Sequence, residues 1–343
     1  MQFRLLEFIR CPSCRSALRL LEAPVVRQSQ RGPEVVSGTL RCNSCGTSYL
    51  IEEGVPRLVV PASIRGLNDK ARTASTYGYL WNRTASMEKS QKFEGYHFDR
   101  MSRSLRLAPH GLVLDAGCGA GIDLVNQARV PQVEIIGVEL SGGGCRQSFH
   151  RSSALACAHV VQSDVCRLPF ADGAFDFIYS YGVLHHLSSP QEGLHELVRV
   201  LKPGATIGVY LYEDLGSHGF GWRWLLQLIN QFRRVTSHLS HRLLFFLCQL
   251  ASPIVYLIFT LPFRLLNRLP GLGTWAAHFP FRHASGPFQL VGDLYDRFSA
   301  PIEWRYSRAQ AVALLESAGL QEIKTALNRG WMVSGVKPSR QCT

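Results

Sequence analysis

The pattern of apolar and polar positions predicts an alternation of strands and helices from residue 111 to the end of the chain. Two segments, 189–204 and 307–320, have the helical spacing of apolar residues, and Pro203-Gly204 is expected to end the first. Short apolar runs between turn residues predict buried strands at 111–115, 133–140, 159–164, 175–187, 205–213, 321–327 and 331–338. Such an alternation is typical of an α/β domain with a mainly parallel sheet.

Two stretches interrupt this pattern. Residues 61–75 are polar and bounded by Pro61 and Gly66, so we interpret them as a connector, and residues 76–101 are rich in aromatic side chains and partly helical. Residues 215–292 contain no Asp or Glu but carry seven arginines, and their centre, 243–261, is almost continuously apolar. We therefore divide the chain at 1–60, 61–110, 111–214, 215–299 and 300–343.

Composition supports a folded chain with room for one large and one small domain. It has 343 residues, of which 46% are hydrophobic and 18% charged, and a formal net charge of +12. The ten cysteines are too sparse for a disulfide scaffold, which favours a reducing compartment. The segment MQFRLLEFIRCP is too short and too charged for a signal peptide, so we expect a cytoplasmic protein.

Four cysteines have the spacing of a metal site. Cys11-Pro-Ser-Cys14 and Cys42-Asn-Ser-Cys45 are two C-x-x-C pairs separated by 27 residues. Two such turns can direct four thiolates at one Zn²⁺, which leaves no open coordination position and so makes the metal structural. Four unrelated thiols and a redox C-x-x-C are the alternatives, and the presence of two pairs argues against the second.

The strand at 111–115 ends in a carboxylate and is followed by a glycine-rich turn. Gly117, Gly119 and Gly121 allow a sharp turn and a close approach to a ligand before a helix begins near Ile122. The spacing is G-x-G-x-G rather than the G-x-G-x-x-G of dinucleotide sites. Asp115 would repel a pyrophosphate but suits a cation, and the cationic methionine portion of S-adenosylmethionine meets this requirement.

Acidic residues also end the next two strands. The Glu139 carboxylate can accept hydrogen bonds from both hydroxyls of a ribose. The Asp164 carboxylate can accept a hydrogen bond from an adenine amino group, while the neighbouring backbone contacts the adenine ring. The complete set of predicted cofactor-binding residues is Asp115, Gly117, Cys118, Gly119, Gly121, Glu139, Leu140, Asp164, Val165, Tyr77 and Trp81. Tyr77 and Trp81 belong to the aromatic segment, where such residues are more often helix core than ligand contacts, and they are kept as candidates because this segment is expected beside the cofactor.

These motifs resemble the class I S-adenosylmethionine-dependent methyltransferases of the quinone-biosynthesis-like group. D-x-G-x-G-x-G, S-D…LPF-x-D-x-x-F-D and V-L-x-H-L…R-V-L-K-P-G occur in the expected order, over residues 105–213 and again over 300–338. The resemblance implies a Rossmann-like fold, with a mixed seven-stranded sheet and helices on both faces. It does not identify the acceptor, because this fold serves many substrates.

The N-terminal segment resembles the zinc-ribbon family of the small activator subunit shared by several RNA and protein methyltransferases. The similarity covers about residues 5–60 and includes C-P-x-C…C-x-x-C-G…Y-x-I…G-x-P-x-L. It implies a fused ribbon packed beside the methyltransferase domain.

Methyl transfer from a sulfonium mainly requires that acceptor, methyl and sulfur be aligned. A base is needed only when the acceptor must lose a proton. His185 and His186 follow the strand at 175–187, where an acceptor should lie, and Tyr181 is a candidate wall or hydrogen-bond donor. The alternative for His186 is a structural hydrogen bond to neighbouring backbone.

The arginine-rich insertion is interpreted as the acceptor side of the protein. Residues 243–261 are nearly long enough to span a bilayer core of about 30 Å. A single crossing is excluded, because the strands after the insertion must join the same sheet as those before it. Two interpretations remain: a helical pair at the membrane interface, with Trp222, Trp224 and Trp275 as anchors, or a soluble lid.

We therefore predict transfer of a methyl group to a hydrophobic small-molecule or lipid-like acceptor, with peripheral contact to the inner face of a membrane as the further expectation. An RNA methyltransferase is the main alternative, because the chain is basic and zinc modules accompany such enzymes. Nucleic acid is a weaker expectation, because the positive charge lies in an apolar segment rather than on a polar groove. A non-enzymatic scaffold is a further alternative. The oligomeric state is left open.

Overall fold

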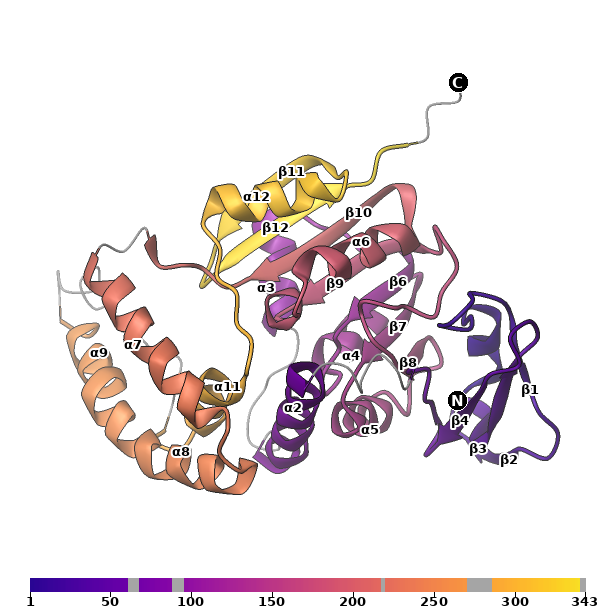
Figure 1. The fold of residues 1–343 in the computed structure, drawn as a ribbon, viewed down its shortest axis with the longest axis horizontal. Coiled ribbons are helices and arrows are strands. Elements are labelled where there is room, and N and C mark those ends of the chain that lie inside the picture. The colour runs from indigo at the N-terminus through magenta and orange to yellow at the C-terminus, as the bar shows by residue number, and fades with distance from the viewer. Residues whose placement is uncertain (61–67, 88–95, 217–219, 270–285, 340–343) are drawn as a thin grey trace. The chain divides into compact units, whose positions relative to one another are not determined.

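The computed structural model describes residues 1–60, 68–87, 96–216, 220–269 and 286–339 (Figure 1). The chain separates into two compact units. The first contains Met1–Phe220 and Ile302–Thr343, and the second contains Gly221–Pro301. Each unit is described by itself.

A seven-stranded mixed sheet forms the centre of the first unit, in the order β11-β12-β10-β9-β6-β7-β8. β12 runs antiparallel to both of its neighbours, whereas the neighbouring pairs from β10 to β8 are parallel. This is the class I methyltransferase arrangement that the sequence predicts. The strands are β6 (Gly111–Ala116), β7 (Val133–Glu139), β8 (Ala158–Gln162), β9 (Phe175–Tyr181), β10 (Leu201–Leu211), β11 (Gln321–Leu327) and β12 (Trp331–Val336).

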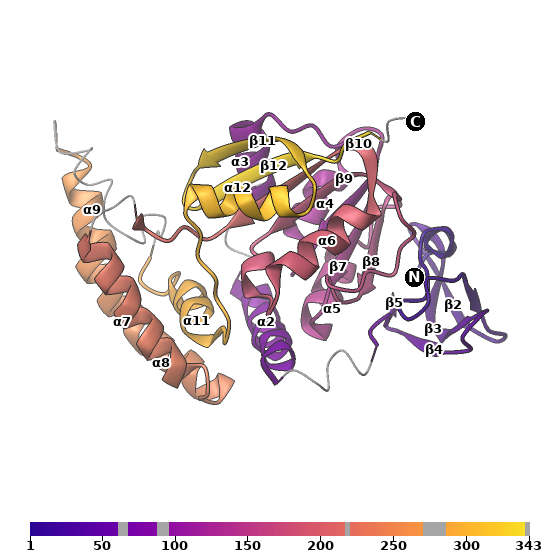
Figure 2. The same ribbon diagram turned by 45° about the horizontal axis from the view of Figure 1, so that its top comes forward.

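Helices cover both faces of this sheet, as Figures 1 and 2 show. On one face, leucines of α6 and α12 join an apolar cluster with inward residues of β6, β9 and β10. On the other, residues of α3, α4 and α5 form a second cluster around Val113, Ile135 and Phe177. The helices are α3 (Tyr96–Leu105), α4 (Ile122–Ala128), α5 (Gly142–Arg151), α6 (Pro190–Val200) and α12 (Arg308–Ser317).

Helix α6 ends earlier than the sequence suggests. The helix stops at Val200, and Pro203-Gly204 lies inside the irregular first part of β10 rather than at the helix end. Lys202 precedes a proline, which disfavours the helical conformation. The Gly204 amide then donates to the Lys337 carbonyl at 2.7 Å, so this segment pairs with the end of the β12 region.

A small antiparallel sheet forms the N-terminal part of the first unit. Its order is β1-β3-β4-β5, with β2 also paired to β3. A short 3₁₀ helix, η1 (Phe3–Glu7), precedes it, and Leu5, Ile9 and Leu40 belong to the same apolar cluster as α6 and α12. The strands are β1 (Leu18–Leu20), β2 (Val25–Ser29), β3 (Gly32–Cys42), β4 (Ser48–Glu52) and β5 (Val55–Pro56).

This ribbon holds the segment that follows β8 at both of its ends. The Leu58 amide donates to the Gln162 carbonyl at 2.8 Å, and the Arg10 amide donates to the Pro169 carbonyl at 2.7 Å. Arg57 also donates to the Gln162 side chain at 3.1 Å. The loop 163–168 therefore begins and ends at backbone hydrogen bonds to the ribbon.

Helix α2 (Asn68–Met87) differs from the expected connector. The helix starts at Asn68, so the second half of the polar segment 61–75 is helical, whereas residues 61–67 lie outside the described part. α2 crosses α5 at two glycines: a Cβ on Gly143 would lie 2.6 Å from the Gly78 carbonyl oxygen, and one on Gly78 would lie 3.4 Å from Ser141 Cβ. The packing of α2 against α5 at these glycines therefore stabilises the helix. Its polar sequence alone does not indicate this contact.

The second unit is helical. In both figures α7 runs alongside α8 and α9. Pro253 lies inside α8, and a π-helical turn, η5, connects α8 to α9, as expected where a proline disturbs the regular hydrogen-bond pattern. The elements are α7 (Phe220–Thr236), α8 (His241–Val255), η5 (Tyr256–Thr260), α9 (Leu261–Leu266) and α11 (Val291–Ser299).

Candidate functional site

The glycine-rich turn connects the end of β6 to α4. Gly117, Gly119 and Gly121 have φ angles of 88°, 52° and 80°, a region that side chains disfavour. A Cβ on Gly117 would lie 2.1 Å from Val183 Cγ2, and one on Gly119 would lie 2.9 Å from the Trp81 ring. Both glycines are therefore required by backbone conformation and by space.

Carboxylates gather beside this turn. Asp115 and Glu139 lie at the carboxyl ends of the neighbouring strands β6 and β7, and Asp123 lies in the first turn of α4; all three are buried. Oδ2 of Asp115 has no hydrogen-bond partner among the described residues. Burial, followed by the nearby Asp123 and Glu139, raises the pKa of Asp115 well above its usual value. A cation at Asp115 would compensate this unfavourable concentration of negative charge.

Glu139 is held by the turn itself. Its Oε2 accepts the Gly119 amide at 3.1 Å and its Oε1 accepts the Ser141 amide at 2.8 Å. Burial raises the pKa of Glu139, and these backbone bonds oppose that shift. Neighbouring Leu140 accepts a bond from Gln162 through its carbonyl at 2.8 Å, and Cys118 is buried with its thiol 3.4 Å from the Ser148 hydroxyl.

Asp164 lies in the loop after β8. Its Oδ1 accepts the Cys166 amide at 3.0 Å, and its Oδ2 forms an ion pair with Lys70 of α2. Val165 is buried beside it. Lys70 escaped prediction from the sequence, because it falls in the segment interpreted as a connector.

Helix α2 contributes Tyr77 and Trp81 to the same region. Trp81 lies against Gly119, since a Cβ at that glycine would meet its ring, and the Trp81 ring stacks on Tyr77 with centroids 6.4 Å apart. The Tyr77 ring centroid is also 5.4 Å from that of His186. The helix therefore joins the glycine turn to the segment after β9.

His185 and His186 form a 3₁₀ turn, η3 (Leu184–His186), after β9. His186 Nδ1 lies 2.7 Å from the Ile302 carbonyl, so Nδ1 donates this hydrogen bond, and in the neutral tautomer that it selects Nε2 is the acceptor nitrogen. His185 is fully buried and stacks on Tyr212 with centroids 3.9 Å apart. Burial, then the adjacent His186, lowers the pKa of His185 well below its usual value, so it is neutral at pH 7.

Tyr181 ends β9 between two other rings. Its ring centroid lies 4.1 Å from that of Tyr210 and 4.5 Å from that of His97. The Tyr181 ring is therefore held between the rings of Tyr210 and His97. The catalytic and cofactor roles of the residues named so far remain predictions.

The four cysteines of the ribbon converge on one point. Their sulfur atoms all lie within 4.8 Å of one another, with Cys11 Sγ–Cys45 Sγ at 3.6 Å and Cys14 Sγ–Cys42 Sγ at 3.3 Å. A tetrahedral zinc with bonds of about 2.3 Å requires sulfur separations of about 3.8 Å. The Ser44 and Cys45 amides point at Cys42 Sγ at 3.4 and 3.5 Å and favour its thiolate, whereas burial, the larger cause, raises the pKa of Cys42 to about 11. The donor set fits structural zinc.

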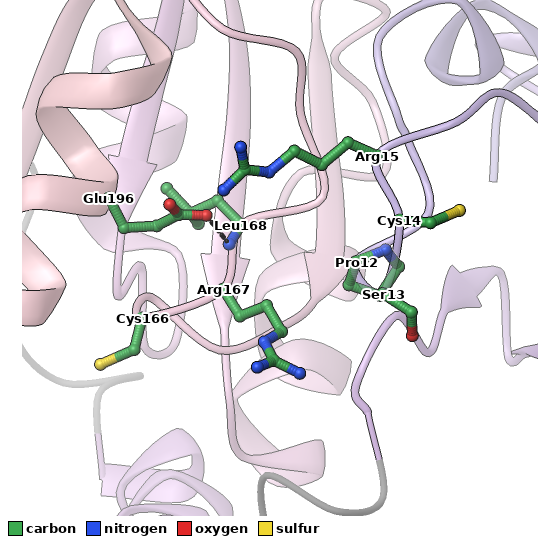
Figure 3. Close-up of a pocket in the computed structure, with 8 residues that line it drawn as sticks. All are labelled: Pro12, Ser13, Cys14, Arg15, Cys166, Arg167, Leu168 and Glu196. Atoms are coloured by element: carbon green, nitrogen blue, oxygen red, sulfur yellow. Dashed lines mark hydrogen bonds between the residues drawn. The ribbon is translucent and has the colours of Figure 1, made fainter.

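A polar hollow of about 410 Å³ lies between the first cysteine turn and the core (Figure 3). It is lined by Pro12–Arg15 of the ribbon, by Cys166–Leu168 of the loop after β8 and by Glu196 of α6. The Leu168 amide donates to Glu196 at 2.8 Å. The hollow lies on the ribbon side of the cofactor loop, and none of the predicted cofactor-binding or catalytic residues lines it.

Comparisons with known proteins match two separate parts of the chain. Residues 114–209 match the family model described as a methyltransferase domain, and residues 2–54 match that of the Trm112p-like protein family. The chain is 36% identical over 122 residues to a demethylmenaquinone methyltransferase of Corynebacterium urealyticum, which covers 35% of this chain and 50% of that protein. It is 29% identical over 146 residues to the botryococcene C-methyltransferase of Botryococcus braunii, which covers 39% of this chain and 38% of that protein.

The chain thus spans half or less of the length of both curated relatives. Among solved structures, the complex between the Haloferax volcanii Trm112 methyltransferase activator and a putative methyltransferase matches 76% of this chain and 97% of that chain, with 15% identity and a TM-score of 0.44. From the family matches and the sheet order, residues 114–209 belong to a methyltransferase domain of the class I fold, and residues 2–54 belong to a Trm112p-like domain that precedes it in the same chain.

Proposed function

We propose that this chain transfers a methyl group from S-adenosylmethionine to a hydrophobic small-molecule or lipid-like acceptor. The observation that carries the proposal is the buried carboxylate cluster at the glycine turn, in which Asp115 keeps an oxygen without a partner among the described residues. A cationic ligand would supply that partner.

The residues present fit this cofactor. Asp115 would hold the cationic methionine portion, Glu139 the ribose hydroxyls and Asp164 the adenine amino group. The left-handed glycines leave the turn without side chains, so its backbone can approach the ligand. Bound there, the cofactor supplies a methyl group already activated on sulfur.

The residues of the chain would then orient the acceptor towards the methyl group. For a hydroxyl acceptor, they would also remove a proton. Positioning alone can lower a barrier by roughly 7–11 kcal/mol. Tyr181 and Tyr77 would form walls. Nε2 of His186 would take the proton, because the Ile302 carbonyl holds Nδ1–H.

A hydrophobic acceptor is favoured by two further facts. The insertion that follows β10 is apolar and lacks carboxylates over residues 215–292. Two relatives carry names of methyltransferases for hydrophobic compounds, botryococcene and demethylmenaquinone.

Calorimetry with S-adenosylmethionine and its demethylated product tests the cofactor half of the proposal. Replacing Glu139 by alanine removes the carboxylate proposed to accept the ribose hydroxyls, so binding should weaken by roughly 10–100-fold, the effect of losing hydrogen bonds to a charged group. Glu316→Ala, at an exposed position of α12, is the matched control and should bind like the wild type. Equal affinity of all three proteins would remove Glu139 from the site.

Cofactor binding should also release a proton. Because the pKa of Asp115 is raised in the folded apoprotein, protonation of Asp115 stabilises the fold. This contribution is complete below the usual aspartate pKa of 3.8 and is lost as pH rises through the raised pKa. A bound cation favours the ionised form, so affinity and the cofactor-induced rise in Tm should both increase with pH over this interval. Calorimetry in buffers of different ionisation enthalpy should detect the proton, and Asp115→Asn should abolish the signal. Binding heat that is independent of the buffer would contradict this assignment.

An RNA acceptor is the second candidate, and the Trm112p-like match over residues 2–54 favours it. The absorbance ratio of the purified full chain, before and after nuclease treatment, distinguishes the two acceptor classes. Copurified nucleic acid that becomes methylated in the presence of radiolabelled cofactor would favour RNA over the hydrophobic acceptor.

A further inference from the structure

The long helix of the second unit exposes an apolar stripe. Eight exposed apolar residues recur along α8, η5 and α9 with a spacing of three or four residues or its multiples, which places them on one face. They are Leu243, Phe246, Leu247, Leu250, Ile254, Leu257, Ile258 and Leu265. Leu250, Ile254 and Leu257 are each more than half exposed, at 57%, 58% and 59%.

The opposite face of this helix is already covered by protein. Leu244, Phe245 and Cys248 are buried, and the Phe245 ring centroid lies 5.7 Å from that of Tyr295 in α11. The Tyr295 hydroxyl lies 2.8 Å from His241 Nδ1. The helix is therefore apolar on two sides. Within its own unit, one side is covered by protein and the other is exposed.

Helix α7 repeats this arrangement. Trp224, Leu228, Phe232 and Val235 are exposed at a helical spacing. On its other side, Arg233 donates to the Arg297 carbonyl at 2.9 Å and Thr236 donates to the Phe298 carbonyl at 2.8 Å, both in α11. Because α7 and α8 both pack their inner sides against α11, their apolar stripes face away from it.

The charged side chains of α7, α8 and α9 are all basic, and the carboxylates of this unit, Asp293 and Asp296, lie in α11. Arg234, Arg242, Arg264 and Arg268 are exposed near the helix ends, and residues 215–292 contain no carboxylate side chain to balance them. Arg223 and Arg282, and the tryptophans at 222 and 275, have side chains outside the described residues. An apolar face with arginines at its margins matches the boundary between acyl chains and anionic head groups.

Crossing the membrane does not fit the topology. His241–Leu266 is long and apolar enough to do so, with a mean hydropathy of 2.1 in a window that is 28% buried. However, β10 precedes this helix and pairs with β12, which follows it, so an odd number of crossings would separate paired strands. A second crossing by α7 would place Gln227, Asn230 and Gln231 in hydrocarbon.

We infer that the outer faces of α7 and α8–α9 form a membrane-binding surface that lies in the interface of an anionic bilayer without crossing it. The surface consists of the two apolar stripes and their exposed arginines. Attachment to a bilayer needs neither cofactor nor acceptor, so this property is separate from methyl transfer.

Sedimentation of the full chain with vesicles tests it. Phosphatidylglycerol–phosphatidylcholine vesicles should bind the protein, and binding should fall as sodium chloride rises, whereas pure phosphatidylcholine should bind it more weakly. Each basic residue near an anionic surface contributes about fivefold, so Arg242→Gln with Arg268→Gln should lower partitioning about 25-fold. The control is Arg19→Gln with Arg103→Gln, which removes the same charge from exposed positions in the first unit and should change partitioning little.

The apolar part is tested by the triple variant Leu250→Gln, Ile254→Gln and Leu257→Gln, which should lower partitioning by at least about tenfold. Its control carries Val25→Gln, Leu50→Gln and Leu327→Gln, which are exposed apolar residues of the first unit. Both triple variants should keep the wild-type affinity for S-adenosylmethionine, so this test and that of the proposed function can fail separately. Equal sedimentation of all variants, or insensitivity to lipid charge, would overturn the inference. Bound protein that resists extraction by alkaline carbonate would overturn the non-crossing arrangement.

Discussion

Replacing Gly117 by alanine is expected to abolish measurable cofactor binding and to lower the free energy of unfolding by about 2–5 kcal/mol. Two costs combine at this position. The φ angle of 88° is unfavourable for a residue with a side chain, and the new Cβ would lie 2.1 Å from Val183 Cγ2. Relief of that clash must move either the turn or the segment that leads into His185 and His186. Chemical denaturation and calorimetry measure the two effects.

A double variant separates strain from collision. Val183→Ala removes the colliding Cγ2 and leaves its Cβ 3.2 Å from the added Cβ, so Gly117→Ala in that background should cost about 1–2 kcal/mol, mainly the backbone term. Gly319→Ala is the matched control, because Gly319 has a φ of 77° but a Cβ added there would meet nothing within 4 Å. If Gly117→Ala costs no more than Gly319→Ala, the predicted collision is absent and the turn is less tightly packed than described.

Replacing Cys42 by serine is expected to release the zinc and to unfold the ribbon. Structural zinc in small domains contributes about 10–16 kcal/mol of binding free energy, far more than a ribbon of this size can replace by packing. The ribbon also holds both ends of the loop that carries Asp164, through Leu58 to Gln162 and Arg10 to Pro169. Loss of zinc should therefore weaken S-adenosylmethionine binding as well, although none of the four zinc ligands lies in the cofactor site.

Metal analysis, proteolysis of the first sixty residues and calorimetry follow these effects in one preparation. Wild-type protein should contain one zinc per chain. Cys157→Ser replaces a half-buried cysteine outside the cluster and should retain zinc and affinity. A Cys42→Ser protein with normal metal content would refute the four-cysteine site. One that loses zinc but keeps full cofactor affinity would show that the loop is held without the ribbon.

The strands and the acidic residues at their ends could be predicted because their signals are local. Each strand is a short apolar run, and in parallel strands the residues that follow share one edge, so Asp115 and Glu139 meet as expected. The cysteine pairs are equally local, since each turn directs two sulfur atoms. Helix α2 was predicted poorly at its start, because residues 68–75 are polar and the helix is stabilised by the Gly78–Gly143 crossing with α5.

The amino-acid sequence by itself determined the class of the fold, the glycine turn, the order of the carboxylates and the four candidate zinc ligands. All of these depend on residues close together in the chain or on a repeated pattern. The tertiary structure alone decided the features that depend on distant segments. These are the ion pair of Lys70 with Asp164, the Ile302 carbonyl that sets the His186 tautomer, and the side of α8 that faces α11 rather than solvent. A helix that is apolar on both sides does not encode which side is covered, because only the packing of another helix removes one of them from water.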